Sequence, residues 1–213
     1  MKIDMHIHTT YSDGFLTPDK AISISKQLGM DGICITDHNC FTQDPEIEKT
    51  ALETELAVFI GMEYTSVEGD ILVYGIRDDA ILKKPRMHAQ DIINFVNSIG
   101  GIAIPAHPYN LFGIGNKIDL KQLTGLYTIE TKNGQMRFDE NERAENTKTA
   151  FRLKGIGGSD AHLPSDLGKA YTLFEKEIRT IDELVHELKY GTYYAVRAET
   201  GDIWENYIKS ILG

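Results

Sequence analysis

The feature that most constrains the fold is a repeated alternation between short apolar runs and longer amphipathic segments. Short runs that contain Ile and other apolar residues, such as residues 2–8 and 101–108, are typical of β-strands, and the segments between such runs have helical periodicity. An alternation repeated six or seven times favours a parallel sheet with crossover helices, either open or closed into a barrel. The sequence therefore predicts an α/β fold.

Capping signals help to place the helices. Thr17 and Asp44 each precede a proline, and a capping residue followed by proline is typical of a helix start. The expected strands are residues 2–8, 31–38, 57–65, 70–76, 101–108, 126–134, 156–162, 170–175 and 192–196. The expected helices are residues 17–29, 44–56, 86–100, 139–155, 180–191 and 202–213. Glycines at the ends of several of these segments predict where the helices stop.

Length and composition indicate a single globular domain over residues 1–213. No run of about 18 apolar residues is present and the N-terminus lacks the pattern of a signal peptide, so we expect a cytoplasmic protein without membrane spans. The formal charge of −10 disfavours binding to long duplex nucleic acid. Two cysteines, Cys34 and Cys40, are too few to indicate a disulfide framework. The oligomeric state stays open.

Histidines and acidic residues gather at the ends of the predicted strands. His6 and His8 are two residues apart in the first strand, so both imidazoles point to the same face. In α/β barrels, functional groups collect at the carboxyl ends of the strands. We therefore expect a cluster of five imidazoles and three carboxylates, formed by His6, His8, Asp13, His38, Glu63, His107, Asp160 and His162.

Such a cluster cannot be buried unless each polar group has a partner. Divalent cations supply that partner, and mixed nitrogen and oxygen ligands suit Zn, Mn or Fe. Eight ligands exceed what one tetrahedral ion accepts, so we predict a site for two or three divalent metal ions. Asp37 faces away from the cluster if its strand is regular, and we interpret it as a structural carboxylate.

Five motifs around these residues resemble the PHP (polymerase and histidinol phosphatase) family. They are "DMHIHTTYSDG", "ITDHN", "GME", "PAHP" and "GGSDAH", and they occur in the family's order along nearly the whole chain. The segment 155–213 contains a stretch that resembles the PHP-associated C-terminal module of small stand-alone members. The resemblance implies a distorted (β/α)7, TIM-like barrel with a site for two or three metals.

The resemblance also implies how the ligands divide between the metals. It assigns one metal to His6, His8, Glu63 and Asp160, and a second to Asp13, His38 and His162. Glu63 would bridge to a third position, which His107 would also ligate. Many members supply a further histidine from the next strand, but residues 70–76 contain none, so Asp70 or a water would substitute. Glu130 lies where some relatives carry a polar residue, and its role stays open.

The activity implied by the resemblance is that of a metal-dependent phosphoesterase acting on a small phosphorylated metabolite or nucleotide. A hydroxide activated by the metals would attack phosphorus, and the metals would stabilise charge on the phosphoryl oxygens. We predict the catalytic residues to be Glu63, His107, Asp160 and His162, with no general acid assigned. Three basic residues are candidates for orienting the phosphate of the substrate: Lys132, Arg137 and Arg197.

Three other functions stay open. A histidinol-phosphate phosphatase would use the same chemistry on one defined substrate, although no residue selects histidinol. A metal hydrolase of the amidohydrolase type also begins with His-x-His on a barrel strand, but it usually bridges its metals with a modified lysine, and Glu63 stands in that role here. A module that binds metal without turnover would be expected to have lost ligands, and this set is nearly complete.

Overall fold

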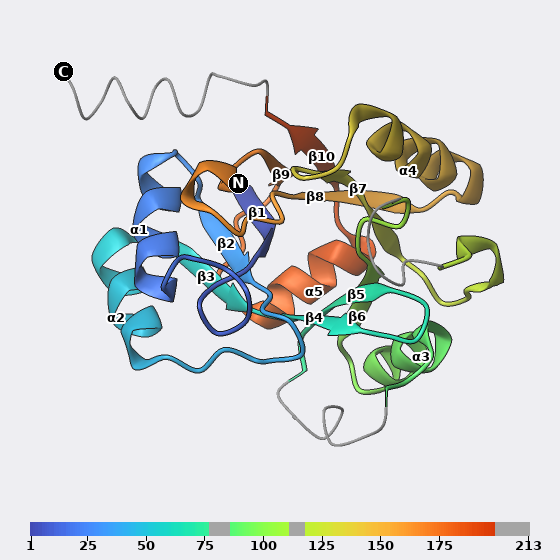
Figure 1. The fold of residues 1–213 in the computed structure, drawn as a ribbon, viewed down its shortest axis with the longest axis horizontal. Helices are drawn as coiled ribbons and strands as arrows, with labels where there is room; N and C mark the ends of the chain where they lie inside the picture. The colour runs from blue at the N-terminus through green and yellow to red at the C-terminus, as the bar shows by residue number, and fades with distance from the viewer. Residues whose placement is uncertain (77–85, 111–117, 199–213) are drawn as a thin grey trace.

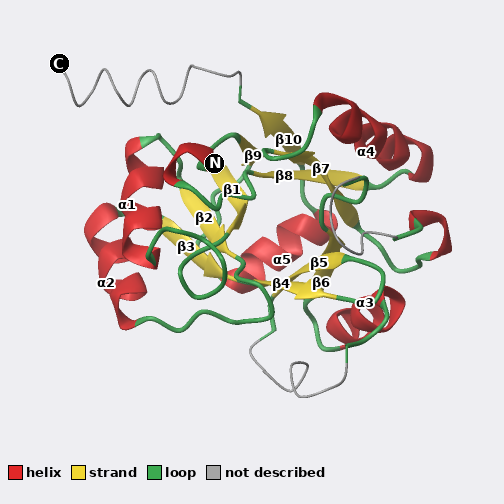
Figure 2. Cartoon of the chain, viewed as in Figure 1, coloured by secondary structure: helices red, strands yellow, loops and turns green. Residues whose placement is uncertain are grey.

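The part of the chain that the structure describes forms three β-sheets with helices around them (Figures 1 and 2). The computed structural model describes residues 1–76, 86–110 and 118–198. Its strands are β1 (Lys2–Ile7), β2 (Gly32–Ile35), β3 (Ala57–Ile60), β4 (Met62–Thr65), β5 (Asp70–Tyr74), β6 (Ile102–Pro105), β7 (Thr128–Asn133), β8 (Lys154–Gly158), β9 (Ala170–Phe174) and β10 (Tyr193–Arg197). The sheets have the orders β10-β9-β1-β2-β3, β4-β5-β6 and β7-β8. The predicted α/β class is therefore confirmed.

The helices are α1 (Pro18–Gln27), α2 (Pro45–Thr54), α3 (Ala89–Ser98), α4 (Phe138–Phe151) and α5 (Ile181–Tyr190), and 3-10 turns cover Leu120–Gln122 and Pro164–Asp166. Both predicted proline starts are confirmed. Asp44 also caps α2, because its side chain accepts a hydrogen bond from the Glu46 N–H. None of the helices in the described ranges combines the length and the apolar character needed to cross a bilayer. The predicted helix of residues 202–213 lies outside the described residues.

The predicted helix of residues 139–155 ends earlier than expected. α4 stops at Phe151, because Arg152 adopts a left-handed conformation with φ of 56° and closes the last turn. Gly155, which was expected to stop the helix, lies inside β8 instead. A Cβ at Gly155 would lie 2.5 Å from Oγ1 of Thr131 on β7, so the glycine allows the two strands to pair closely.

The predicted strand of residues 57–65 is two strands that belong to different sheets. β3 pairs with β2, β4 pairs with β5, and Gly61 lies between β3 and β4. A Cβ at Gly61 would lie 2.6 Å from the ring of Tyr74, which is closer than side chains approach each other. The chain therefore needs a glycine where it passes from one sheet to the next.

The strands are not all parallel, which corrects the prediction of a parallel sheet. β1, β2 and β3 run parallel, as do β7 and β8, but β5 runs antiparallel to both β4 and β6. Only a short turn joins β4 to β5, and in it the N–H of Ser66 donates to the carbonyl of Gly69. Such a turn can only reverse the chain, because a parallel pair needs a crossover of about a dozen residues or more.

The strands of the described residues do not close into one barrel, in contrast to the (β/α)7 barrel that the resemblance implies. β9 pairs antiparallel with the start of β1 and occupies the edge that β8 would need. β8 is connected to β1 only beyond its own end. There the N–H of Asp160 donates to the carbonyl of His6, and the N–H of His8 donates to the carbonyl of Ala161. The insertion of β9 therefore interrupts the ring of strands.

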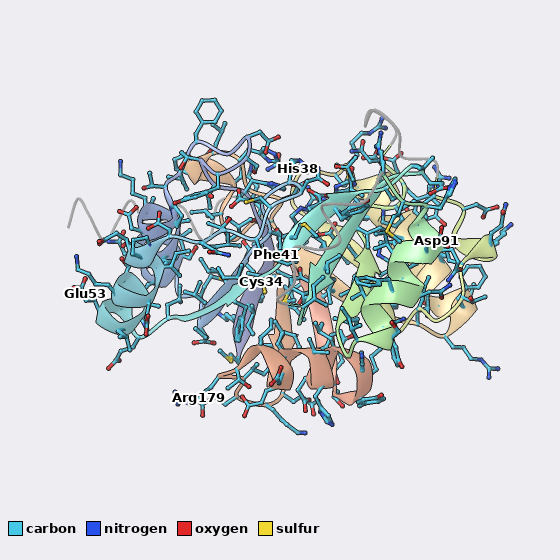
Figure 3. All side chains as sticks on the ribbon, turned by 90° about the horizontal axis from the view of Figure 1, so that it is seen from below. Cys34, His38, Phe41, Glu53, Asp91 and Arg179 are labelled. Atoms are coloured by element: carbon cyan, nitrogen blue, oxygen red, sulfur yellow. The ribbon has the colours of Figure 1, made fainter. Side chains whose placement is uncertain are left out.

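One apolar core lies between the three sheets. It includes the fully buried side chains of Met5 on β1, Leu72 on β5 and Ile156 on β8. Apolar side chains of α5 join the same core, so this helix covers one end of it. Figure 3 shows Arg179, which precedes α5, at the opposite side of the molecule from His38. The polar strand ends near His38 therefore lie away from the end that α5 covers.

Candidate metal centre

The strand ends bring four buried side chains of the predicted cluster together. His6 and His8 come from β1 and the residue after it, Glu63 from β4, and Asp160 from the segment after β8. One nitrogen or oxygen atom of each residue lies within 4.8 Å of such an atom of every other. We call these four residues the inner set, and none of them is more than 6% exposed.

Distances within the inner set fit ligands that surround one cation. Nε2 of His6 lies 3.1 Å from Oε2 of Glu63 and 3.0 Å from Nε2 of His8. Oδ1 of Asp160 lies 3.5 Å from the same His6 nitrogen. Around a tetrahedral ion with bonds of about 2.1 Å, neighbouring ligand atoms are about 3.4 Å apart. Two imidazole nitrogens facing each other also need a proton or a cation between them. The donor set therefore fits a divalent metal.

A second group of ligands surrounds Asp13, and we call it the outer set. It consists of His8, Asp13, His38 and His162. Oδ1 of Asp13 lies 3.3 Å from Nε2 of His162 and 3.6 Å from Nδ1 of His8. Oδ2 of Asp13 lies 3.6 Å from Nε2 of His38. Because the Asp13 side chain is 54% exposed, the outer set is the side of the cluster that solvent reaches.

Glu63 connects the inner set to a third group, formed with His38 and Asp70, which we call the third set. Oε2 of Glu63 lies 3.4 Å from Nδ1 of His38, and Oε1 lies 2.9 Å from Nε2 of His107. Oδ1 of Asp70 is buried and has no hydrogen-bond partner among the described residues. A buried carboxylate oxygen normally has a partner, so this orphaned oxygen suits a cation ligand. His107 contacts Glu63 but belongs to none of the three sets.

Two residues of the cluster have an uncommon backbone conformation. His107 has φ of 28° and Asp160 has φ of 53°, in the left-handed region that residues other than glycine seldom adopt. Both follow the ends of strands, β6 and β8, where the chain must turn sharply. Strain of this kind is concentrated at functional sites, because the surrounding structure must hold it in place.

Glu130 on β7 orients one of the imidazoles of the inner set. Its buried Oε1 lies 3.1 Å from Nδ1 of His6, and Oε2 accepts the main-chain N–H of His107 at 2.8 Å. A carboxylate beside Nδ1 keeps the proton on that nitrogen and leaves Nε2 free for a metal. The role that the sequence left open is thus a supporting one, since Glu130 is in none of the three sets.

Asp37 holds the loop that carries Asp13. Its Oδ1 accepts hydrogen bonds from the N–H of Thr9 and the hydroxyl of Ser12, both at 2.7 Å. Its Oδ2 accepts the hydroxyl of Thr9 at 2.7 Å. Asp37 is fully buried and lies outside the three sets. These contacts are those of a structural carboxylate.

The carboxylates change the proton affinity of the imidazoles. Burial acts to lower the pKa of His8, but contacts with Asp160 and Glu63 outweigh it and raise that pKa to about 9. Burial likewise acts to lower the pKa of His107, but contact with Glu63 outweighs it and raises that pKa to about 9. For Glu63 the signs are reversed. Burial acts to raise its pKa, but the neighbouring imidazoles outweigh burial and hold that pKa well below its ordinary value. Metal binding therefore requires these imidazoles to release protons.

We expect the metal-free protein to lose stability as the pH rises through about 9. His8 and His107 have pKa values of about 9 in the folded protein and an ordinary value of 6.5, so their interaction with Glu63 stabilises the fold fully below pH 6.5. The stabilisation disappears as these imidazoles lose their protons. Urea unfolding of chelator-treated protein at pH 6.5 and at about pH 9.5 measures the effect.

The control for this pH dependence is His186→Ala, since the His186 side chain is 63% exposed and lies on α5. This variant should show the same loss of stability between the two pH values as the unaltered chain. Equal stability of the unaltered metal-free protein at both pH values would contradict the assignment of raised pKa values to the cluster.

The three basic residues predicted to orient a phosphate form no hydrogen bond or ion pair with the three sets among the described residues. Lys132 is half-buried on β7. Arg137 is 59% exposed and pairs with a neighbouring aspartate, and Arg197 donates to a main-chain carbonyl at 2.7 Å. The register between β7 and β8 shifts between Glu130 and Lys132, and Asn133 is the residue whose side chain contacts Asp160 of the inner set. Their role in binding substrate stays a prediction.

Comparisons of sequence connect the chain to known proteins. A family model described as PHP-associated matches residues 138–193. The uncharacterised protein MJ1587 of Methanocaldococcus jannaschii is 31% identical over 122 residues, which cover 52% of this chain and 69% of that protein.

Solved structures resemble the fold. A two-domain protein of Bacteroides vulgatus that contains a predicted PHP-like metal-dependent phosphoesterase has a TM-score of 0.71 at 17% identity, covering 98% of this chain and 69% of that one. A candidate metal-dependent phosphoesterase of Bifidobacterium adolescentis has a TM-score of 0.61 at 17% identity, covering 75% and 87%. An amidohydrolase of Chromobacterium violaceum with bound sulfate has a TM-score of 0.66 at 18% identity, covering 95% and 100%. At such identities the likeness concerns the fold alone.

Proposed function

Because the chain is a PHP-domain protein, we propose that it is a metal-dependent phosphoesterase acting on a small phosphorylated metabolite or nucleotide. The observation that carries this proposal is that the three ligand sets share residues. His8 belongs to the inner and outer sets, His38 to the outer and third sets, and Glu63 to the inner and third sets. A neutral imidazole binds one metal at a time, so His8 and His38 would each serve one of their two sets, whereas Glu63 can bind two ions through its carboxylate. A site that holds metal ions side by side is typical of enzymes that hydrolyse phosphoesters with more than one metal.

The side chains of the cluster have distinct tasks in this proposal. Zn, Mn or Fe ions held by the sets would lower the pKa of water towards neutrality and offset charge on the phosphoryl oxygens. Glu130 would keep the proton of a neutral His6 on Nδ1 and leave Nε2 for the metal, and Asp37 holds the loop that carries Asp13. His38 and His162 are each 32% exposed, so they lie where a substrate can approach the cluster.

We assign Asp70 to the position for which many PHP members supply a histidine. The support is the orphaned Oδ1 of Asp70 and its place in one set with His38 and Glu63. Compared with a site made of nitrogen ligands alone, a site with this oxygen ligand would bind Mn or Fe more readily, because carboxylates are harder ligands than imidazoles. His107 would act on the same metal position through Glu63, with which it forms a hydrogen bond.

We also propose that three basic residues orient the phosphate: Lys132, Arg137 and Arg197. The support is a loop that begins at Asn133, since Asn133 contacts Asp160 of the inner set. Arg197 donates to the carbonyl of Met136 in this loop, and Arg137 ends the loop at the start of α4. Arg197 is therefore held to this segment by a hydrogen bond, and Arg137 belongs to it through the chain itself.

A second candidate function is hydrolysis of a carbon–nitrogen bond, as in amidohydrolases. The observation that favours it is the similar fold of the amidohydrolase from Chromobacterium violaceum. Glu63 counts against it, because this carboxylate is shared by the inner and third sets and so takes the bridging role that a modified lysine usually has in amidohydrolases. A histidinol phosphate substrate is compatible with the same cluster, and no residue described here selects it.

The metal content of the protein tests the proposal first. We expect elemental analysis of gently purified protein to give two or three equivalents of Zn, Mn or Fe per chain. The double variant Asp160→Ala, His162→Ala removes a ligand from the inner set and one from the outer set, so it should retain at most one equivalent. A panel of phosphoesters and amides then separates the two candidate functions.

The results of this test differ between the candidates. Turnover of phosphoesters, lost in the double variant, supports the proposal. Turnover of amides without turnover of phosphoesters supports the amidohydrolase reading. A protein that neither contains metal nor takes it up on reconstitution would contradict both.

A further inference from the structure

Asn133 at the end of β7 links two carboxylates of the metal centre. Its side chain is buried, with 1% exposure. Nδ2 of Asn133 lies 3.0 Å from Oε2 of Glu130 and 3.2 Å from Oδ2 of Asp160. Because an amide NH2 group carries two hydrogens, it can donate to both carboxylates at the same time.

Neighbouring groups determine which way this amide points. Oδ1 of Asn133 accepts the main-chain N–H of Gln135 at 2.9 Å, so Nδ2 must face the carboxylates. The main chain of Asn133 is held by Asn141 on α4, which packs beside β7 in Figure 1. Oδ1 of Asn141 accepts the Asn133 N–H at 2.8 Å, and Nδ2 of Asn141 donates to the Asn133 carbonyl at 3.0 Å. The amide is therefore held in one orientation.

This orientation gives the two oxygens of Asp160 different partners. Asn133 binds Oδ2, whereas Oδ1 lies 3.3 Å from Nε2 of His8 and 3.5 Å from Nε2 of His6. Asp160 thus presents one oxygen to the inner set while the other is held in a hydrogen bond. Rotation of the carboxylate to bind an ion through both oxygens would break that bond.

The same amide acts on His6 through Glu130. Oε2 of Glu130 is shared between the Asn133 amide and the main-chain N–H of His107, and Oε1 is left for Nδ1 of His6. Both carboxylate oxygens of Glu130 therefore have partners. Loss of the amide would leave part of a buried negative charge without a donor, and Glu130 could then move away from His6.

We propose that Asn133 is a positioning residue of the inner set. Its amide keeps Asp160 as a ligand through one oxygen and keeps Glu130 on the proton-bearing nitrogen of His6. The inference rests on the metal centre of the proposed function, and it does not depend on which bond the protein hydrolyses.

Metal affinity tests this proposal without any substrate. In the chain of residues 1–213 with Asp13→Ala and Asp70→Ala, the outer and third sets each lack their aspartate, so titration with Co²⁺ reports mainly on the inner set. Adding Asn133→Leu keeps a similar side-chain volume and removes both donors. We expect the Co²⁺ affinity, measured by competition with a chelator, to fall about 10- to 100-fold, as when other hydrogen-bond partners of metal ligands are lost. The visible absorption of bound Co²⁺ should change as well, because Asp160 is free to alter its coordination.

The matched control is Asn97→Leu in the same Asp13→Ala, Asp70→Ala background, since Asn97 lies in α3 and its amide donates to the carbonyl of Gly125, away from the three sets. Its Co²⁺ affinity and absorption should match those of the parent. If Asn133→Leu does not fold, Asn133→Ala decides by the same two measurements. Unchanged affinity and absorption in an Asn133 variant that folds would overturn the proposal. An affinity loss in a protein that hydrolyses no phosphoester would contradict the proposed function and leave this inference standing.

Discussion

Replacing Glu63 with Gln should lower turnover of phosphoesters by about 1000-fold or more, because the change neutralises the carboxylate that the inner and third sets share. Glu63 is 1% exposed, and the structure brings its two oxygens to between 2.9 and 3.4 Å from nitrogens of His6, His8, His38 and His107. Gln keeps the shape of the side chain but carries no charge to hold two cations. Steady-state kinetics and elemental analysis on the same samples measure the loss of activity and of metal.

The matched control is Glu68→Gln. Glu68 is a partly exposed carboxylate that lies 2.6 Å from Nδ1 of the exposed His88, and it belongs to none of the three sets. Glu68→Gln should leave metal content and turnover unchanged. Full metal content in Glu63→Gln, together with turnover close to that of the unaltered chain, would show that Glu63 does not join the metal positions.

A single methyl group at Gly158 should also abolish metal binding by the inner set. A Cβ at Gly158 would lie 2.4 Å from Cβ of His6, 2.9 Å from the main-chain nitrogen of His6 and 3.0 Å from Oε1 of Glu130. The first two atoms belong to β1 and cannot move without shifting the strand. Overpacking of this kind costs about 1–3 kcal/mol, and here the shift falls on a ligand and on the residue that orients it. Co²⁺ titration and urea unfolding of Gly158→Ala measure both effects.

The neighbouring Gly157→Ala separates damage to the site from damage to the fold. A Cβ at Gly157 would lie 2.4 Å from the carbonyl oxygen of Tyr171 on β9, so this variant should also be destabilised. Its clash lies on the β9 side of β8 and touches no ligand. Where it folds, Gly157→Ala should keep its metal. Gly158→Ala with the same metal affinity as the unaltered chain would contradict the close packing of β8 against His6.

The positions of the cluster could be predicted because each depends on local geometry. His6 and His8 share a face since side chains alternate along a strand, and this needs no knowledge of the rest of the fold. His38, His107 and Asp160 lie two or three residues beyond the ends of β2, β6 and β8. Pro18 and Pro45 likewise placed the starts of α1 and α2, because the fixed φ of proline acts within the first turn. The side chain of Asp44 caps α2, whereas that of Thr17 makes no capping hydrogen bond.

The contribution of β7 to the site shows where local reasoning fails. Regular alternation places Lys132 on the face of Glu130. The structure instead has a register shift between these residues, and Asn133 contacts Glu130 and Asp160. A bulge depends on how one strand fits its partner, so the sequence of β7 alone did not reveal it.

The sequence by itself determined the α/β class and the residue types at the strand ends, because periodicity and capping are set by neighbours along the chain. Only the tertiary structure decided that β9 occupies the edge of β1 and interrupts the ring of strands. It also decided that Glu130 and Asn133 support the ligands and that Asp70 lies beside His38 and Glu63. These contacts join residues far apart in sequence, and register and packing between elements select them.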